Sequence, residues 1–394
     1  MNRRGVHDVV VVGAGMVGAA VALALARKGL DVAVIESRPP APWREDDEVD
    51  LRVVALAPSS IDLLRRVDVW TAISSARACA YRTMRVWDSL APGALAFDAA
   101  DEHESALGWI VENKLIQHAL WQALQREPRI TLRCPARVAG TEADARRRVL
   151  ALDDGDTLSA QLVVAADGAD SALRAMAGIG VQERHYGQRA VVAHVTTQRA
   201  HESTAWQRFL PQATIAFLPL ADGRSSIVWS VPDAEAARLL ALDDVAFCRE
   251  LGAAFDFRLG AITATSARAA FPLRLRLAES YLAPRLALIG DAAHVVHPLA
   301  GQGVNLGLRD VDELCQVLVA ARSAQRDFAA AAVLRRYERR RRSDNAVAAH
   351  AFDAIQRVFG SPSMPVAAVR GAALAAVEHL PPLKSLFARH AAGR

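Results

Sequence analysis

The stretch Asp8-Val-Val-Val-Val-Gly13-Ala-Gly15-Met-Val-Gly18 lies near the start of the chain and decides its fold. A short apolar run leads into a turn with three glycines, and an alanine- and leucine-rich helix former then continues to Lys28. A second apolar run, residues 32–35, ends at Glu36. The order strand, glycine turn, helix, strand and acid is typical of the βαβ unit that binds the ADP half of a dinucleotide.

The glycines of this turn have separate tasks. Gly13 permits the tight turn, Gly15 lets a pyrophosphate approach the backbone, and Gly18 allows the helix to pack closely on the strand. The helix start offers amide groups and a dipole that favour phosphates. Glu36 lies at about the ~20-residue offset of a carboxylate that binds ribose hydroxyls. These four residues are predicted to bind the cofactor, although they do not separate FAD from NAD.

A second glycine-rich segment lies two-thirds of the way along the chain. Leu286-Ala-Leu-Ile-Gly290-Asp291 predicts a buried strand followed by an acid, whose carboxylate can accept hydrogen bonds from a ribitol chain. Three glycines within residues 301–307 leave room for a flat ring against the backbone. A helix expected to begin at Val304 or Asn305 would present its positive end to that ring. A reduced flavin is an anion that such a helix end stabilises, so the second segment favours FAD.

Composition excludes several classes of protein. The chain has 394 residues, 52% of them hydrophobic. Its 47 basic residues only slightly outnumber its 43 acidic residues, so the positive charge is too small to indicate nucleic-acid binding. No run approaches the ~18 apolar residues of a membrane span, and no secretory signal opens the chain. The four cysteines are scattered, which argues against zinc or disulfide frameworks and favours a cytoplasmic enzyme. His294 and His297 lack a third ligand nearby, so we expect loop histidines or flavin-site donors and no metal.

The pattern of hydrophobic residues changes near residue 190. Residues 191–196, 213–219 and 225–231 are strand-like, and they predict an antiparallel sheet with its own core. After residue 304 the pattern is helical almost to the end. The fold class predicted is α/β: a Rossmann-like FAD-binding domain interrupted by an α+β substrate domain, with helices at the C-terminal end. The boundaries expected are 1–75, 106–182 and 278–345 for the FAD-binding domain, 76–105 and 183–277 for the substrate domain, and 346–394 for the C-terminal region.

Several motifs together carry a family resemblance. They are Gly13-Ala-Gly-Met-Val-Gly18, Asp50-Leu-Arg52-Val-Val-Ala-Leu, Val111-Glu-Asn-Lys-Leu-Ile-Gln117, Ala166-Asp167-Gly168, Gly290 to Asp310, and Tyr337 to Asn345. The chain resembles the class A flavin-dependent aromatic monooxygenases, which share the p-hydroxybenzoate-hydroxylase-like fold. Within them it is most similar to the hydroxylases of ubiquinone biosynthesis, over nearly its full length.

The resemblance assigns further site residues. It implies that Arg52, Gln117 and Asp167 approach a non-covalently bound FAD, and that Asp291 holds the ribitol. It implies a cofactor-binding loop and helix start that line the isoalloxazine: Pro298, Gly301, Gln302, Gly303, Val304 and Asn305. Within that loop, Pro298, Gly301 and Gly303 are our candidates for shaping the reaction site. For the substrate, the resemblance implies contacts from Phe217, Leu218 and Pro219.

The resemblance also implies a reaction. NAD(P)H reduces the FAD, O2 then forms a C4a-hydroperoxyflavin, and one oxygen atom passes to the aromatic ring of a polyprenyl phenol in ubiquinone biosynthesis. Three alternatives remain open: a hydroxylase of a soluble aromatic acid or secondary metabolite, a flavin-binding scaffold subunit of a biosynthetic assembly, and an isoprenoid reductase of related fold. No nucleic-acid partner is expected.

The sequence of the C-terminal part does not decide whether that part contacts solvent, protein or a membrane. Residues 335–342 include six arginines, which on a helix would spread over several faces and indicate a solvated or partner-facing helix. The tail, residues 366–386, is too broken to span a bilayer. It could dock on the core, self-associate, or lie on the inner face of a membrane. Other ubiquinone-biosynthesis proteins or a second copy of the chain are further candidate partners.

Overall fold

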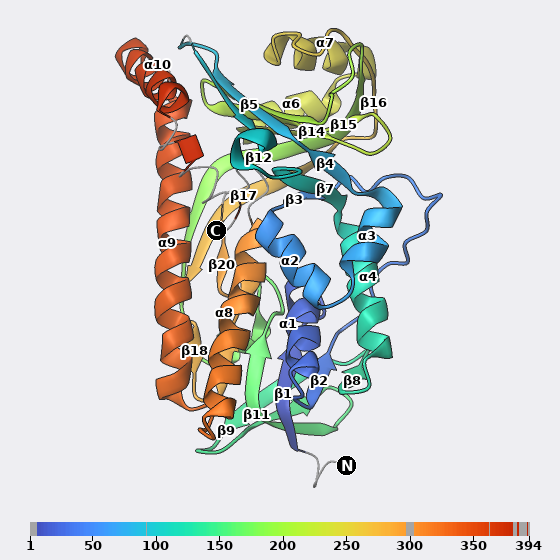
Figure 1. Cartoon of the computed structure of the whole chain (residues 1–394), viewed down its shortest axis with the longest axis vertical. Coiled ribbons are helices and arrows are strands. Elements are labelled where there is room, and N and C mark those ends of the chain that lie inside the picture. Colours follow the sequence, from blue (N-terminus) through green and yellow to red (C-terminus); the bar gives the residue numbers. More distant parts are fainter. Residues whose placement is uncertain are drawn as a thin grey trace.

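The computed structural model describes residues 6–91, 93–296, 303–361, 363–380, 384, 385 and 392. Two large sheets lie one above the other, with a small third sheet between them and a long helix along one side (Figure 1). This arrangement confirms the predicted α/β fold class with a second, antiparallel sheet.

The lower sheet is mostly parallel and contains the predicted βαβ unit. Its strands are β1 (Val6–Val12), β2 (Val32–Ile35), β8 (Ile130–Arg133), β9 (Val138–Ala143), β10 (Arg148–Leu152), β11 (Thr157–Ala165), β18 (Leu282–Ala283) and β19 (Leu286–Leu288). The main path runs β18-β19-β11-β1-β2-β8, and β10 and β9 extend from β11. β2 and the inner half of β1 are fully buried, which explains their uninterrupted apolar sequences.

The upper sheet is largely antiparallel. Its strands are β5 (Thr83–Asp88), β6 (Ala94–Asp98), β12 (Val181–Thr197), β13 (Thr204–Leu210), β14 (Ala213–Pro219), β15 (Ser225–Pro232), β16 (Ile262–Thr265), β17 (Ala269–Ala278) and β20 (His294–Val295). The order is β20-β17-β12-β15-β14-β13-β5-β6, with β16 beside β12. A third sheet has the order β3 (Val53–Leu56), β7 (Gly108–Glu112), β4 (Cys79–Tyr81).

Helices cover the outer faces of both sheets (Figure 1). They are α1 (Met16–Arg27), α2 (Pro58–Arg66), α3 (Trp70–Arg77), α4 (Asn113–Arg126), α5 (Ala172–Met176), α6 (Asp233–Ala241), α7 (Asp244–Ala254), α8 (Gly303–Ser323), α9 (Ala331–Gly360) and α10 (Met364–His379), with short 3-10 turns η1 (Ala99–Glu102) and η2 (Gly290–Ala292). α1 packs against α4 and α8, and α8 packs against α9. The domain boundary predicted after residue 345 falls inside α9, which continues through that position.

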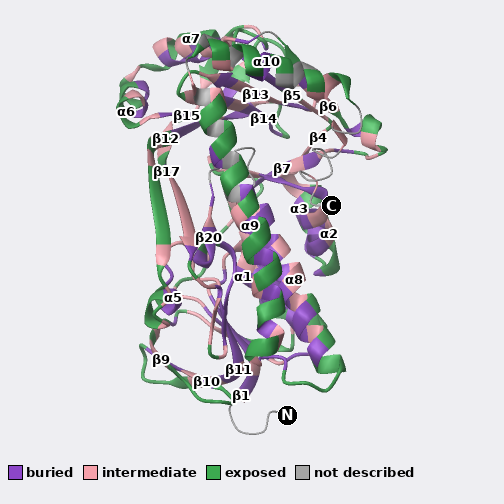
Figure 2. Cartoon of the chain, turned by 90° about the vertical axis from the view of Figure 1, so that its left-hand side faces the viewer, coloured by how far each residue is buried: buried purple, intermediate pink, exposed green. Residues whose placement is uncertain are grey.

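The helix α9 extends alongside both sheets and shows one buried and one exposed side (Figure 2). Near its end, α10 docks on the upper sheet. Arg370 forms a fully buried ion pair with Asp88 at 3.2 Å and also donates to carbonyl groups at the end of α9. Glu378 accepts a hydrogen bond from the main-chain nitrogen of Ala96 on β6. The described part of the tail therefore docks on protein.

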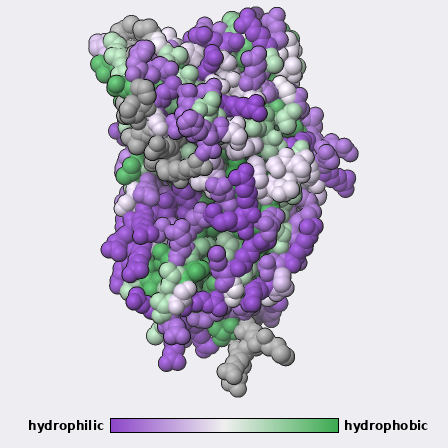
Figure 3. All heavy atoms as spheres, in the orientation of Figure 1, coloured by the Kyte–Doolittle hydropathy of each residue, from purple (hydrophilic) through white to green (hydrophobic). Residues whose placement is uncertain are grey.

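Hydrophilic residues cover much of the face seen in Figure 3. Within the part of the chain that the structure describes, no helix is both long enough and apolar enough to span a membrane.

Candidate cofactor and active site

Close contacts with neighbouring backbone atoms explain two of the three glycines in the turn after β1. Gly13 has a φ of +99°, and a Cβ there would lie 2.3 Å from the carbonyl oxygen of Ala166. A Cβ on Gly18 would lie 1.9 Å from the carbonyl oxygen of Gly13. A Cβ on Gly15, in contrast, would meet no atom within 4 Å. Gly13 and Gly18 are therefore required by the fold, whereas Gly15 borders open space of the kind that a pyrophosphate needs.

The start of α1 faces this open space. The helix begins at Met16 with Gly15 as its N-cap, and no side chain caps its first turn. Its free amide groups and positive dipole end therefore remain available to an anion. Glu36 lies beside the turn, because its Oε2 accepts a hydrogen bond of 2.6 Å from the main-chain nitrogen of Ala14. The residues predicted to bind the ADP half are thus gathered at one end of β1 and β2.

The late glycine segment packs directly on α1 through Val17. Gly290 has a φ of +57°, and a Cβ there would lie 3.2 Å from Val17 Cγ1. A Cβ on Gly307 would lie 2.6 Å from Val17 Cγ2. Gly307 therefore allows α8 to approach α1, and it does not make room for a flat ring as the sequence had suggested. The two predicted motifs form one continuous site.

Asp291 follows β19 in the turn η2. Its side chain is exposed to solvent, yet surrounding protein desolvates the carboxyl and raises its pKa, against the opposing charges of His294 and Arg52. Arg52, which immediately precedes β3, also lies 5.5 Å above the ring of Phe271 on β17. Arg52 therefore acts electrostatically on the acid of the lower sheet and contacts an aromatic ring of the upper sheet.

Asn305 has a structural role, and its implied place beside the isoalloxazine stays a prediction. The helix α8 begins at Gly303, just before the expected start, and Asn305 is fully buried. Its Oδ1 accepts hydrogen bonds from the main-chain nitrogen of Ala57 and from Ser60 Oγ, at 2.9 and 2.7 Å, and its Nδ2 donates to the carbonyl oxygen of Ala55 at 2.8 Å. The side chain thus ties the helix start to β3 and α2, and so positions the backbone that was predicted to line the ring.

Asp167 lies at the end of β11, beside Gly13. Its Oδ1 accepts a hydrogen bond of 2.5 Å from Ser171 Oγ, and its Oδ2 accepts one of 3.1 Å from the main-chain nitrogen of Leu173. The carboxylate therefore caps α5 and holds the backbone at the turn. Gln117 is half-buried on α4. Their predicted contacts with FAD stay predictions.

The rest of the predicted ring-lining loop is only partly described. Pro298, Gly301 and Gln302 lie outside the described residues. Gly303 is the first residue of α8, and a Cβ there would meet no atom within 4 Å. Val304 is half-buried against the core of the lower sheet.

The predicted substrate strand β14 presents its residues to two different faces. The Phe217 ring is fully buried and stacks on Phe255, with centroids 3.7 Å apart, in the core beneath α6 and α7. Leu218 points to the opposite face and packs with Ala55 and Ile110 of the small sheet. Pro219 shares the face of Phe217. Leu218 is therefore the member of the three that faces the cofactor-binding side, and its substrate contact stays a prediction.

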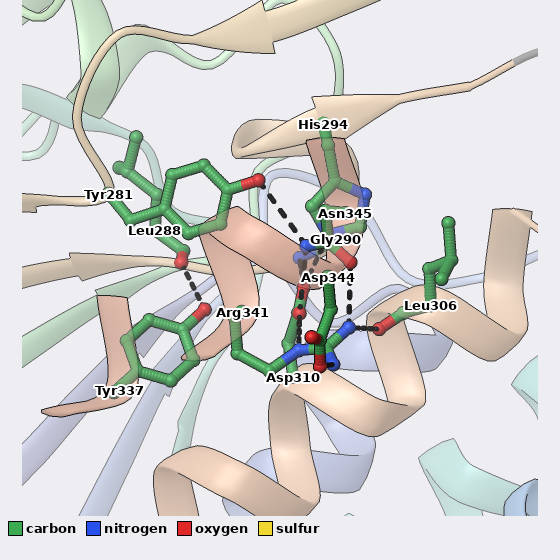
Figure 4. Close-up of polar contacts among 10 residues, drawn as sticks. All are labelled: Tyr281, Leu288, Gly290, His294, Leu306, Asp310, Tyr337, Arg341, Asp344 and Asn345. Atoms are coloured by element: carbon green, nitrogen blue, oxygen red, sulfur yellow. Dashed lines mark hydrogen bonds and ion pairs between the residues drawn. The ribbon is translucent and has the colours of Figure 1, made fainter. Parts of the chain in front are cut away.

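A buried charge network behind Asp291 was not predicted from the sequence (Figure 4). Asp310 on α8 is fully buried, and its Oδ2 accepts hydrogen bonds from His294 Nε2 at 2.5 Å and from the main-chain nitrogen of Gly290 at 2.9 Å. Its Oδ1 accepts from Arg341 Nε at 2.7 Å, and Arg341 Nη2 donates to Asn345 Oδ1 at 2.7 Å. Burial alone would raise the pKa of Asp310, but the charges and hydrogen bonds of His294 and Arg341 hold it below the usual range.

The network corrects two expectations. His294 is a buried partner of Asp310 on the short strand β20 and not a loop histidine, and a hydrogen bond from it to the flavin stays a prediction. Arg341 lies on the buried side of α9, whereas the other five arginines of residues 335–342 are exposed as expected. Within the described residues, no cluster of three or more side chains could hold a metal ion.

Comparisons with known proteins show the family of the chain. Residues 6–353 match the family described as an FAD binding domain. The chain is 40% identical over 386 residues, 98% of each chain, to 3-demethoxyubiquinol 3-hydroxylase of Escherichia coli. It is 35% identical to the human ubiquinone biosynthesis monooxygenase COQ6, covering 96% of this chain and 91% of that protein.

Solved structures share the fold. A p-nitrophenol 4-monooxygenase from Pseudomonas putida superimposes with a TM-score of 0.74 at 20% identity, over 97% of this chain and 96% of that one. Klebsiella pneumoniae HpxO, solved with FAD and uric acid, gives a TM-score of 0.71 at 19% identity, over 98% and 95%.

The family match and the glycine turns define an FAD-dependent flavoprotein monooxygenase. Within that class, the chain belongs to the family of the ubiquinone-biosynthesis hydroxylases, with which it shares sequence from end to end. The structure fits FAD: open space at Gly15 lies before the uncapped start of α1, and the exposed carboxylate of Asp291 lies within the electrostatic influence of Arg52.

The Asp291 carboxylate gives a direct test of FAD binding. Asp291→Ala should lower the FAD that copurifies by at least ~tenfold, because losing ~1.4 kcal/mol of polyol hydrogen bonding costs that factor in affinity. Asp291→Asn, which keeps one acceptor oxygen, should retain more. Flavin absorbance per protein measures the outcome, and a normal flavin content in the alanine variant would contradict the ribitol contact.

Proposed function

We propose that the protein uses NAD(P)H and O2 to hydroxylate the aromatic ring of a polyprenyl phenol or related ubiquinone precursor. The observation that carries this proposal is the position of Arg52, which acts electrostatically on Asp291 of the FAD-binding segment and lies over the ring of Phe271 on a separate sheet. That junction would leave room for an aromatic substrate between the cofactor and the sheet. The 40% identity with 3-demethoxyubiquinol 3-hydroxylase supports a quinol-type ring.

The proposed tasks of the residues follow from their positions. Gly15 and the α1 amides would hold the pyrophosphate, Glu36 the adenosine ribose, and Asp291 the ribitol. When bound, FAD would supply the redox and oxygen-transfer chemistry. The positive start of α8, fixed by Asn305, would stabilise negative charge on the reduced ring.

Exclusion of water is the other task of the protein. The cluster around Leu218, with Ala55, Ile110 and Leu220, is buried and apolar at the junction of the sheets. An apolar surface at this place would favour an uncharged prenylated ring. It would also keep water away from the oxygen-transfer reaction. NAD(P)H as the donor, contact with a membrane surface and assembly with other ubiquinone-biosynthesis proteins stay predictions.

Activity is tested by supplying the purified, FAD-loaded protein with NADH or NADPH and a farnesyl-bearing phenol in detergent micelles. We expect the phenol to stimulate NAD(P)H oxidation and oxygen uptake, with a product heavier by one oxygen atom. Stimulation only by soluble aromatic acids would favour the alternative hydroxylase. Reductase activity would consume NAD(P)H without oxygen uptake, and a scaffold subunit would bind FAD without substrate-stimulated turnover.

A further inference from the structure

His194 lies on β12 with both ring nitrogens buried and without a hydrogen-bond partner in the described part of the chain. Its direct cross-strand neighbour on β15 is Ser226, whose Oγ is equally buried and also has no partner. Buried polar groups are nearly always hydrogen-bonded, and leaving them unpaired costs free energy. Cross-strand neighbours have Cβ atoms roughly 5 Å apart, so the two side chains form one polar spot.

This polar spot faces the cofactor-binding side. Side chains alternate along a strand, and Val191, Ala193 and Val195 point to the core beneath α6 and α7. His194 therefore points to the opposite face. Across the sheet, His194 on β12 is paired with Ser226 on β15, and Ser226 is paired with Leu218 on β14. Leu218 packs against the small sheet.

The spot also shares its sheet face with the aromatic ring that Arg52 covers. The row of His194 continues along β12 through Val192 to Ala190, which pairs with Phe271. Arg52 lies over the ring of Phe271. His194 and Ser226 are therefore on the sheet face between the predicted substrate residue Leu218 and the arginine that approaches the FAD site.

The imidazole is uncharged near neutral pH. Burial, followed by the charge of Arg224, lowers the pKa of His194 to about 4 against the opposing acids Asp222, Glu48 and Asp50. A neutral imidazole offers one N–H donor and one acceptor nitrogen, and a serine hydroxyl offers both. The pair therefore matches an uncharged hydroxyl on an aromatic ring, which both donates and accepts a hydrogen bond.

We propose that His194 and Ser226 form the site that recognises the ring hydroxyl of a phenol or quinol substrate. The acceptor nitrogen of His194 binds the substrate O–H, and the Ser226 hydroxyl completes the hydrogen bonds, which orients the ring toward the cofactor. This inference rests on the proposed function, because it specifies which part of that substrate the sheet recognises.

The chain provides a matched control in Ser225. Ser225 and Ser226 are adjacent, are each 1% exposed, and have Oγ atoms without a hydrogen-bond partner among the described residues, but they point to opposite faces of β15. Ser225→Ala and Ser226→Ala thus remove the same group from two faces of one strand. His194→Leu removes both nitrogens at similar volume, and His194→Asn restores a donor and an acceptor.

The experiment measures the affinity of the FAD-loaded protein for a farnesyl-bearing phenol and for its methyl ether, from the change in the flavin absorption spectrum. We expect the wild type to prefer the phenol by roughly tenfold or more, since a site built to bind a hydroxyl discriminates against the analogue without it. Ser226→Ala and His194→Leu should bring this ratio toward one, His194→Asn should restore part of it, and Ser225→Ala should leave it unchanged. Flavin content and melting temperature check that each variant is folded.

Equal effects of Ser225→Ala and Ser226→Ala would overturn the inference, as would a wild type with no preference for the phenol. If His194→Leu does not fold, the serine pair alone decides. Normal hydroxylation with an unchanged ratio in the folded variants would refute only the hydroxyl site. A phenol preference lost in Ser226→Ala, without any hydroxylated product from the wild type, would instead refute the proposed function.

Discussion

Gly18→Ala should strongly destabilise the lower sheet. The added Cβ would lie 1.9 Å from the carbonyl oxygen of Gly13, and that oxygen belongs to a tight turn that cannot move away cheaply. We expect the free energy of unfolding to fall by about 3 kcal/mol, at the upper end of the cost of overpacking. Denaturant-induced unfolding, followed by circular dichroism without added FAD, measures the loss.

Gly15→Ala is the matched comparison, because a Cβ there meets no protein atom within 4 Å. The residue has ordinary extended dihedral angles, so the apoprotein should gain about 0.4–1 kcal/mol from the stiffer unfolded chain. The methyl group would nevertheless occupy the space reserved for the pyrophosphate, and FAD affinity should fall by at least ~tenfold. A Gly15→Ala protein with wild-type flavin content would show that the pyrophosphate lies elsewhere.

Asp310→Ala should be the most destabilising change at the rear of the site. The substitution would leave Arg341 buried without its carboxylate and would remove the acceptor that holds Gly290 and His294. Breaking a buried ion pair from one side costs about 3–5 kcal/mol. The turn that carries Asp291 would also lose its support, so flavin content should fall together with stability.

Asp312→Ala on the same helix is the control for Asp310→Ala. Asp312 pairs with Arg66 at the surface, and exposed pairs of this kind contribute about 0–1 kcal/mol. Denaturant midpoints of the two variants should therefore differ clearly. Equal midpoints would show that the buried network contributes no more to stability than the surface ion pair does.

The network also predicts the direction of a pH effect. The folded-state pKa of Asp310 is below its unfolded value, so its contribution is present above the usual carboxyl range and is lost as pH falls through the folded pKa. The wild type should therefore lose more stability on acidification than Asp310→Asn does. Unfolding titrations at a series of acidic pH values compare the two.

The features that could be predicted from the sequence are local ones. Gly13, Gly15 and Gly18 lie within one turn, and Glu36 ends the next strand, so spacing alone fixes their relative positions. The strand before Asp291 is likewise a short apolar run that ends in glycine and acid. A carboxylate at the end of a buried strand could therefore be placed without any knowledge of the tertiary structure.

The features that could not be predicted depend on packing between distant segments. Asp310 meets Arg341 across 31 residues, and nothing in the arginine-rich stretch distinguishes that residue from its exposed neighbours. Asn305 is separated from Ala57 by 248 residues. The alternation along β14 could have shown that Phe217 and Leu218 face opposite sides, but only the packing of α6 and α7 shows which side is the core.

The two anchors of α9 limit how the molecule can move. Near its middle Arg341 is held by Asp310 of the lower half, and near its end the helix is fastened through Arg370 to Asp88 of the upper half. Its 30 residues form a stiff rod of about 45 Å. A wide hinge opening between the halves would have to break a buried ion pair, so the prenylated substrate that we propose would enter through local rearrangement of loops.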